Sequence, residues 1–168
     1  MGRLSRTCSA LLLALAVFGV PPAAQAAEPR VAADLEGQPI AAEAIPDFFC
    51  TDRDFPLIHC YKTAARLDAA VQQRPALSSL ATAATVYVVI YSGQTYSGSY
   101  MYVSQDYDIL ALVGWNDRIR SYRGVNSGRG IFWTDWYRTG IGIPFCCNTW
   151  VPALASDVDR AFSSVYRS

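Results

Sequence analysis

The chain has 168 residues, enough for one domain with a small appendage, and its 14 basic and 14 acidic residues cancel. A chain with this balance lacks the excess of positive charge that is typical of nucleic-acid-binding proteins, so we expect no nucleic-acid partner. Beyond residue 26, no stretch is long and apolar enough to predict a membrane span, which needs about 20 apolar residues.

Residues 1–26 have the pattern of a secretory signal peptide. Arg3 and Arg6 precede an apolar run over 10–20, and Ala24 and Ala26 occupy the −3 and −1 positions of a cleavage site. A membrane anchor is the alternative, but the run is too short for it. We therefore predict cleavage after Ala26, a secreted, extracellular protein and no membrane attachment after cleavage.

Four cysteines follow the predicted cleavage site: Cys50, Cys60, Cys146 and Cys147. An even number of cysteines in a short secreted chain favours two disulfides over a zinc site that includes His59. The spacing of the cysteines also fits no standard zinc pattern. Because a bond between neighbours would close a strained ring, we favour pairing of both Cys146 and Cys147 with the two earlier cysteines.

Residues 27–84 predict an N-terminal arm with a short hairpin and a helix. The stretch 27–45 lacks periodicity and is expected to be disordered or loosely attached, whereas 47–61 contains two apolar runs around a polar turn. A helix is predicted after Thr63, its N-cap, and before Pro75, with apolar residues at helical spacing. Residues 76–84 are a linker or a further helical turn.

From residue 85 onward the composition changes to that of an all-β domain. Val86, Val88 and Ile90 alternate with residues of the opposite face, and further short apolar runs are separated by turn residues. Glycines punctuate these runs, as turns with positive φ require. We therefore predict antiparallel strands over 85–168.

An internal repeat runs through this β region. Residues 115–121 align with 158–164 at an offset of 43. Upstream, Tyr91, Tyr96 and Gly98 have a weaker counterpart in 133–140, where Trp133 and Gly140 keep the same separation. A period near 40 predicts two copies of a four-strand Greek key that bury a core only when stacked as two sheets.

These motifs resemble those of the βγ-crystallin superfamily, whose units carry an aromatic corner followed by an Asn/Asp-rich loop. The resemblance covers about half of the chain and implies an all-β sandwich of two Greek keys over 85–168, preceded by the short arm with one helix. A generic sandwich with chance matches is the alternative. The leader and the sequence GWNDRI also resemble small secreted bacterial inhibitors of this fold, which act on metalloproteinases.

The resemblance implies paired calcium sites in which the two loops exchange ligands. The first site is intact: Asn116, Asp117, the carbonyl of Arg118, and Ser163 from the other loop. The second keeps Asp159 and the carbonyl of Ala161 but has Arg160 and Arg120 at ligand positions. Arginine cannot ligate a cation, so we expect Arg120 to pair with Asp159 through a bidentate ion pair. At most one weakly bound calcium is expected, and no other cofactor; alternatively, both loops are structural turns.

The sequence argues against an enzyme. His59 is the one histidine, next to a cysteine expected to be oxidised, and Asp106 and Asp108 are typical of solvated turn residues. No phosphate loop, dinucleotide motif or haem motif is present.

Two functions follow. The first is inhibition of an extracellular proteinase, a metalloproteinase by the resemblance, through a contact segment over 139–148 that offers Ile141, Ile143 and Phe145. These residues would otherwise form an inner strand. The second is a non-inhibitory, structural or weakly calcium-binding βγ-crystallin-like protein. The oligomeric state is not predicted.

Overall fold

The computed structural model describes residues 31–73 and 85–168. The predicted signal peptide and the linker over 76–84 lie outside these residues. Two antiparallel units make up the second half of the described chain. The first contains β5 (Val88–Tyr91), β6 (Tyr100–Val103) and β7 (Ser121–Gly124). The second contains β8 (Gly130–Trp133), β9 (Gly142–Phe145), β10 (Trp150–Val151) and β11 (Ser164–Arg167).

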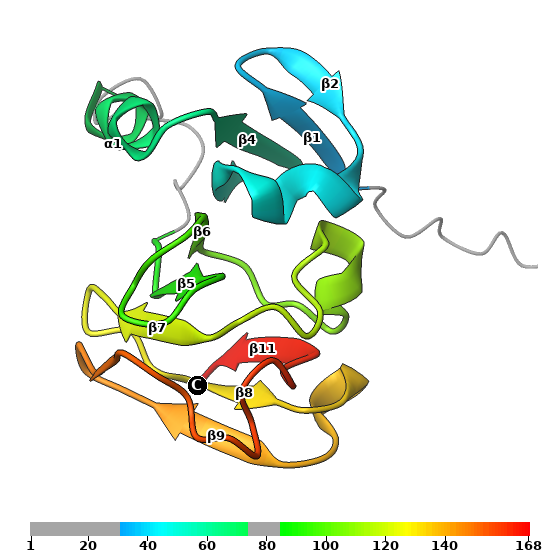
Figure 1. Ribbon diagram of the computed structural model, residues 1–168, viewed down its shortest axis with the longest axis vertical. Coiled ribbons are helices and arrows are strands. Elements are labelled where there is room, and N and C mark those ends of the chain that lie inside the picture. Colours follow the sequence, from blue (N-terminus) through cyan, green and yellow to red (C-terminus); the bar gives the residue numbers. More distant parts are fainter. Residues whose placement is uncertain (1–30, 74–84) are drawn as a thin grey trace, which may run out of the picture.

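The two units exchange a strand. β10 pairs with β7 of the first unit, while Tyr107, which occupies the third-strand position of that unit, bridges to Val165 in β11. The result is an eight-stranded sheet ordered β10-β7-β5-β6-β3-β4-β1-β2 and a three-stranded sheet ordered β11-β8-β9. The two sheets lie one below the other in Figure 1. Buried side chains between them include Ile90, Phe132 and Phe162, so each unit buries its apolar face against the other.

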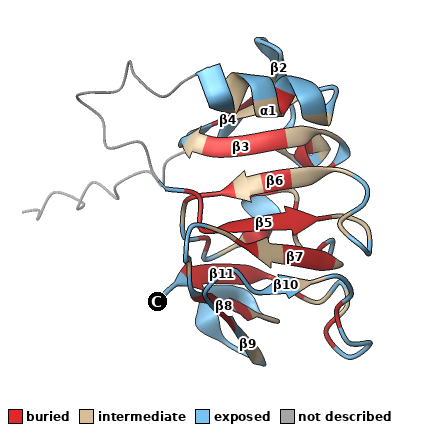
Figure 2. Cartoon of the chain, turned by 90° about the vertical axis from the view of Figure 1, so that its left-hand side faces the viewer, coloured by how far each residue is buried: buried red, intermediate tan, exposed pale blue. Residues whose placement is uncertain are grey.

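The N-terminal residues extend the larger sheet instead of forming a separate arm. They comprise β1 (Ala32–Leu35), β2 (Gln38–Ile40), the 3₁₀ helix η1 (Ala42–Asp47), β3 (Phe49–Asp54), β4 (Leu57–Tyr61) and α1 (Ala64–Gln73). β3 runs parallel to β6, with Cys50 opposite Met101. Figure 2 shows β3, β6, β5 and β7 following one another across one continuous layer. The expectation of a loosely attached 27–45 is therefore wrong for 31–45, where Ile45 is fully buried.

Asp52 joins the N-terminal strands to the β domain. Its carboxylate is buried and accepts hydrogen bonds from the Ser104 amide (2.7 Å), the Ser104 hydroxyl (2.6 Å), the Gln105 amide (3.2 Å) and the Tyr107 hydroxyl (2.9 Å). Burial raises the pKa of this carboxyl, and the four donors oppose that rise. A satisfied buried carboxylate of this kind fixes how β3 sits against the segment after β6.

The helix α1 forms as the sequence predicts. The Thr63 hydroxyl accepts the Arg66 amide at 3.3 Å, which is the expected N-cap. Leu67 is fully buried beneath the helix, and the Asp68 carboxylate accepts the hydroxyls of Tyr100 and Tyr102 from β6, both at 2.9 Å. The two tyrosine hydroxyls thereby hold the helix to β6 of the first unit. Among the described residues, no helix is long and apolar enough to cross a membrane.

Both disulfides differ from the predicted connectivity. Cys50 pairs with Cys60, its direct partner across β3 and β4, and Cys146 pairs with its neighbour Cys147. The reason is topological. β10, which follows Cys146 and Cys147, is separated from β3 by three strands. At about 4.8 Å per strand the two lie roughly 19 Å apart, well beyond disulfide reach. All four cysteines are nonetheless oxidised, as predicted.

Candidate functional site

The candidate site lies where the corners of the two units (residues 91–98 and 133–140) meet their loops (residues 115–121 and 158–164). In the first corner the Ser121 hydroxyl donates to the Gly93 carbonyl (2.7 Å), and the Tyr96 amide donates to that hydroxyl (3.2 Å). In the second corner the Ser164 hydroxyl donates to the Asp135 carbonyl (2.7 Å) and accepts the Arg138 amide (3.4 Å). The second corner is therefore a true copy of the first, despite its weak sequence signal.

The corner residues align at an offset of 42, one less than the loops. Tyr96, with φ of 59°, corresponds to Arg138, with φ of 63°, and Gly98 corresponds to Gly140, with φ of 76° and 77°. An offset of 43 would pair Tyr91 with Thr134, whereas the offset of 42 in the corners pairs Tyr91 with Trp133.

The two loops exchange backbone hydrogen bonds. The Asp117 amide donates to the Phe162 carbonyl, and the Arg160 amide donates to the Ile119 carbonyl, both at 3.1 Å. Asp117 and Arg160 both adopt left-handed conformations, with φ of 56° and 57°. This reciprocity places the loops side by side, in the register that the 43-residue repeat predicts.

The first loop opens onto a surface hollow. Asn116 and Ser163 line it together with Asp135, Trp136, Tyr137 and Thr139. The Asn116 side-chain amide donates to the Asp117 carboxylate at 2.6 Å, and the Trp136 indole N–H donates to the Asn116 side-chain oxygen at 3.2 Å. The structure thus brings Asn116 and Ser163, 47 positions apart, to one place. Asp135, which the sequence reasoning missed, lies there because the second corner folds over the loop.

The oxygen atoms of this first loop suit a hard cation. An Asp carboxylate, an Asn amide oxygen, a Ser hydroxyl and a backbone carbonyl are all calcium ligands. The Arg118 guanidinium lies 3.7 Å from the Asp47 carboxylate. The Arg118 side chain therefore points toward residues 31–73, which we call the N-terminal layer. Within 31–73 and 85–168, no group of three or more His, Cys, Asp or Glu side chains could hold a metal ion. A cation here would therefore rely largely on neutral oxygens.

The second loop is closed by the predicted ion pair. The Arg120 Nε lies 3.3 Å from both Asp159 carboxylate oxygens, and its Nη2 lies 3.1 Å from one of them. The Asp159 side chain is 15% exposed. A second cation, the Arg160 guanidinium, lies near the same carboxylate, with its Nε at 4.0 Å. Two guanidinium groups thus occupy the space around the one acidic ligand of the second loop.

The three predicted inhibitory contact residues differ in their exposure to solvent. Ile141 is 55% exposed, but Phe145 is 4% exposed and packs against Tyr87 and Phe132 in the core. Ile143 is partly buried against the same core. The assignment of Phe145 as a contact residue is wrong, because alternate residues of β9 face the sandwich interior.

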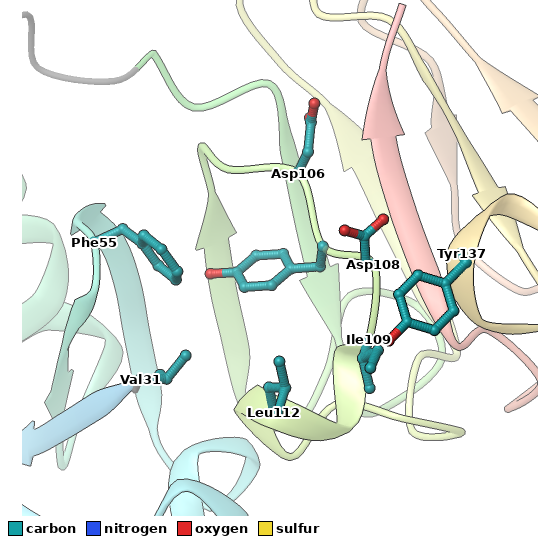
Figure 3. A pocket seen from close by; sticks show the side chains of 8 residues that line it. Val31, Phe55, Asp106, Asp108, Ile109, Leu112 and Tyr137 are labelled. Carbon is teal, nitrogen blue, oxygen red and sulfur yellow. The ribbon is translucent and has the colours of Figure 1, made fainter. Parts of the chain in front are cut away.

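His59 and Asp106 have structural partners. His59 faces Asp34 through Nδ1 (2.6 Å) and Asp54 through Nε2 (3.1 Å). Asp106 accepts the Arg167 amide at 2.9 Å and lies 3.5 Å from its guanidinium. Figure 3 shows Asp106 and Asp108 beside a second hollow, with Val31 and Phe55 across it.

Comparison with known proteins gives structural neighbours only. No family model and no curated protein matches the chain. A βγ-crystallin from Ciona intestinalis has a TM-score of 0.44 at 20% identity, over 48% of this chain and 98% of its own. A βγ-crystallin domain from Flavobacterium johnsoniae has 0.43 at 22%, over 49% and 93%, and one from Clostridium beijerinckii 0.43 at 17%, over 48% and 95%.

The fold is all-β and βγ-crystallin-like. Its two Greek-key units exchange a strand, their corners are duplicated, and their loops exchange backbone hydrogen bonds. The neighbours carry no inference about activity.

Proposed function

We propose that the protein is an exported, non-enzymatic βγ-crystallin-like protein that binds a single calcium ion weakly through its first loop. The observation that carries the proposal is the asymmetry between two otherwise matching loops. Asn116 and Ser163 line an open hollow beside Asp117, whereas Arg120 neutralises Asp159 in the second loop.

The expected affinity is low because few charges serve the site. Asp117 is the one carboxylate of the proposed ligand set, and the remaining ligands are the oxygens of Asn116 and Ser163 and the Arg118 carbonyl. Sites of this kind in extracellular modules have Kd values on the order of 10⁻⁴–10⁻³ M. Asp135 adds a second negative charge at the same hollow. The Trp136 indole would orient the Asn116 side-chain oxygen, so its fluorescence offers a local probe of binding.

Calorimetric titration with calcium tests this proposal. The wild type is expected to bind one ion, and Asp117→Ala to give no binding heat. Asp108→Ala is the matched control, because Asp108 is also an exposed acid but lines the other hollow. Retained binding in Asp117→Ala, or an equal loss in Asp108→Ala, would contradict the site assignment.

Inhibition of a metalloproteinase is a second candidate function, supported by one observation. Trp136, Tyr137 and Ile141 are 50%, 58% and 55% exposed on the second corner. Hydrogen bonds within the corner fix the backbone that presents these side chains, which reduces the entropy lost on binding. Residual activity of a thermolysin-type proteinase, measured with wild type and Ile141→Asp, tests it. Inhibition by the wild type that Ile141→Asp loses supports this function, and no inhibition by the wild type removes it.

A further inference from the structure

The bond between Cys146 and Cys147 differs from the other disulfide in its surroundings. Cys50 and Cys60 are fully buried between the sheet and η1. Cys146 and Cys147 lie in the turn between β9 and β10, and both are exposed. An attacking thiolate needs access to a sulfur atom, and only the second pair provides it.

The turn that carries this pair has hydrogen bonds of its own. The Cys147 amide donates to the Gly128 carbonyl and the Thr149 amide to the Cys146 carbonyl, both at 2.9 Å. The Ser127 amide donates to the Asn148 side-chain oxygen at 3.2 Å. In addition, a bond between adjacent residues closes the shortest loop in the chain and restricts the unfolded state least. The disulfide is therefore not what stabilises the turn.

A positive charge lies beside one of the two sulfurs. The Arg129 Nη2 is 3.8 Å from the Cys147 Sγ. A neighbouring guanidinium favours the thiolate form of a cysteine, and a more stable thiolate is a better leaving group in exchange. The two sulfurs are therefore inequivalent, and Cys147 is the one suited to leave.

We propose that Cys146–Cys147 is a thiol-exchange site for small thiols, a property separate from calcium binding. The thiolate of an external thiol attacks the Cys146 Sγ and forms a mixed disulfide there. The Cys146–Cys147 bond breaks, and its electron pair remains on the Cys147 Sγ as a thiolate beside Arg129. A second external thiolate then attacks the sulfur of the bound thiol, which releases the thiol as its symmetrical disulfide and leaves two reduced cysteines.

Timed exposure of the folded chain to 2-mercaptoethanol tests the proposal. After acid quenching and alkylation, peptide mass spectrometry locates each open cysteine and each mixed disulfide. We expect Cys146–Cys147 to open first, with the adduct on Cys146, while Cys50–Cys60 stays closed as the internal control. Equal opening of both pairs, or an adduct confined to Cys147, would overturn the proposal.

Arg129 variants separate exchange from a merely structural role. Arg129→Ala should slow opening by roughly three-fold, because an exposed charge acts modestly and is screened by salt, and Arg129→Lys should restore the rate. Opening the pair should leave the melting temperature unchanged within a few degrees. An unchanged rate in Arg129→Ala would refute the role of Arg129, and a large fall in melting temperature would identify the bond as a structural crosslink instead.

Discussion

A cation stacked on an aromatic ring recurs in both units, with the two partners interchanged. In the first unit the Arg123 guanidinium lies 3.8 Å from the centre of the Tyr96 ring. In the second, Arg138 occupies the position of Tyr96, and its guanidinium lies 3.7 Å from the centre of the Tyr166 ring. Tyr166 in turn corresponds to Arg123 at the offset of 43. The contact is therefore preserved although neither residue type is, which explains why the second corner resembles the first so weakly in sequence.

Replacing Arg138 with alanine should lower the free energy of unfolding by about 1 kcal/mol, since a partly exposed cation–π contact is lost. Arg138→Lys should recover part of that loss, because it restores the charge without the planar group. Urea unfolding followed by tryptophan fluorescence measures both. A loss of stability in Arg138→Lys as large as in Arg138→Ala would indicate that the charge contributes nothing.

Replacing Arg120 with serine should lower the free energy of unfolding by about 1–2 kcal/mol in calcium-free buffer. This estimate lies between the values for exposed and buried ion pairs, because Asp159 would keep its partly buried charge without its closest partner. Arg118→Ser is the matched control: its pair with Asp47 is exposed, and the expected change is below about 0.5 kcal/mol. Equal effects of the two substitutions in urea unfolding would contradict the special role of Arg120.

At the scale of elements, local patterns were predictable and nonlocal pairings were not. α1 has a cap and helical spacing, and the loop repeat fixed the register in which Arg120 meets Asp159. In contrast, β1 and β2 contain four and three residues, too few to establish an alternating pattern. Their place in the sheet depends on β3 running parallel to β6, a pairing between distant segments that also determines which cysteines can meet.

The Asp52 link between β3 and the first unit predicts an unusual pH dependence. Burial raises the pKa of Asp52 above the ordinary value of 3.8, so its protonated form is favoured in the folded state. Its contribution to stability is full below pH 3.8 and falls as the pH rises through the raised pKa. Asp52→Asn lacks this titration and places an amide N–H₂ among hydrogen-bond donors, which should cost about 1–3 kcal/mol at acidic pH.

Urea unfolding of wild type and Asp52→Asn at several pH values between 3.5 and 8 measures this difference. The advantage of the wild type should be largest at the acidic end and should shrink toward neutral pH. An advantage that grows with pH would mean that the four donors outweigh burial and lower the pKa of Asp52.

On the scale of the whole molecule, residues 31–73 share a sheet with the first Greek-key unit and β10, and they share a core with both units. Ile45, Cys50 and Ile58 from the N-terminal layer belong to the same buried cluster as Met101 and Phe132. Without that layer, β6 would become an unpaired edge and Met101, now fully buried, would lose part of its cover. The expected arm is thus an integral part of the β structure.

This shared core predicts a single cooperative unfolding transition. All four tryptophans lie beyond residue 114, so their fluorescence reports the two Greek-key units, whereas far-ultraviolet circular dichroism reports the whole chain. The two probes should give coincident urea midpoints. Separate midpoints would indicate that the N-terminal layer unfolds independently.

The central claim, one cation site in the first loop and none in the second, is tested most directly by a crystal structure determined in calcium-saturated solution. We expect one anomalous peak, about 2.3–2.6 Å from side-chain oxygens of Asp117 and Ser163, with the Arg120–Asp159 pair intact. A peak at Asp159, or calcium in both loops, would contradict it.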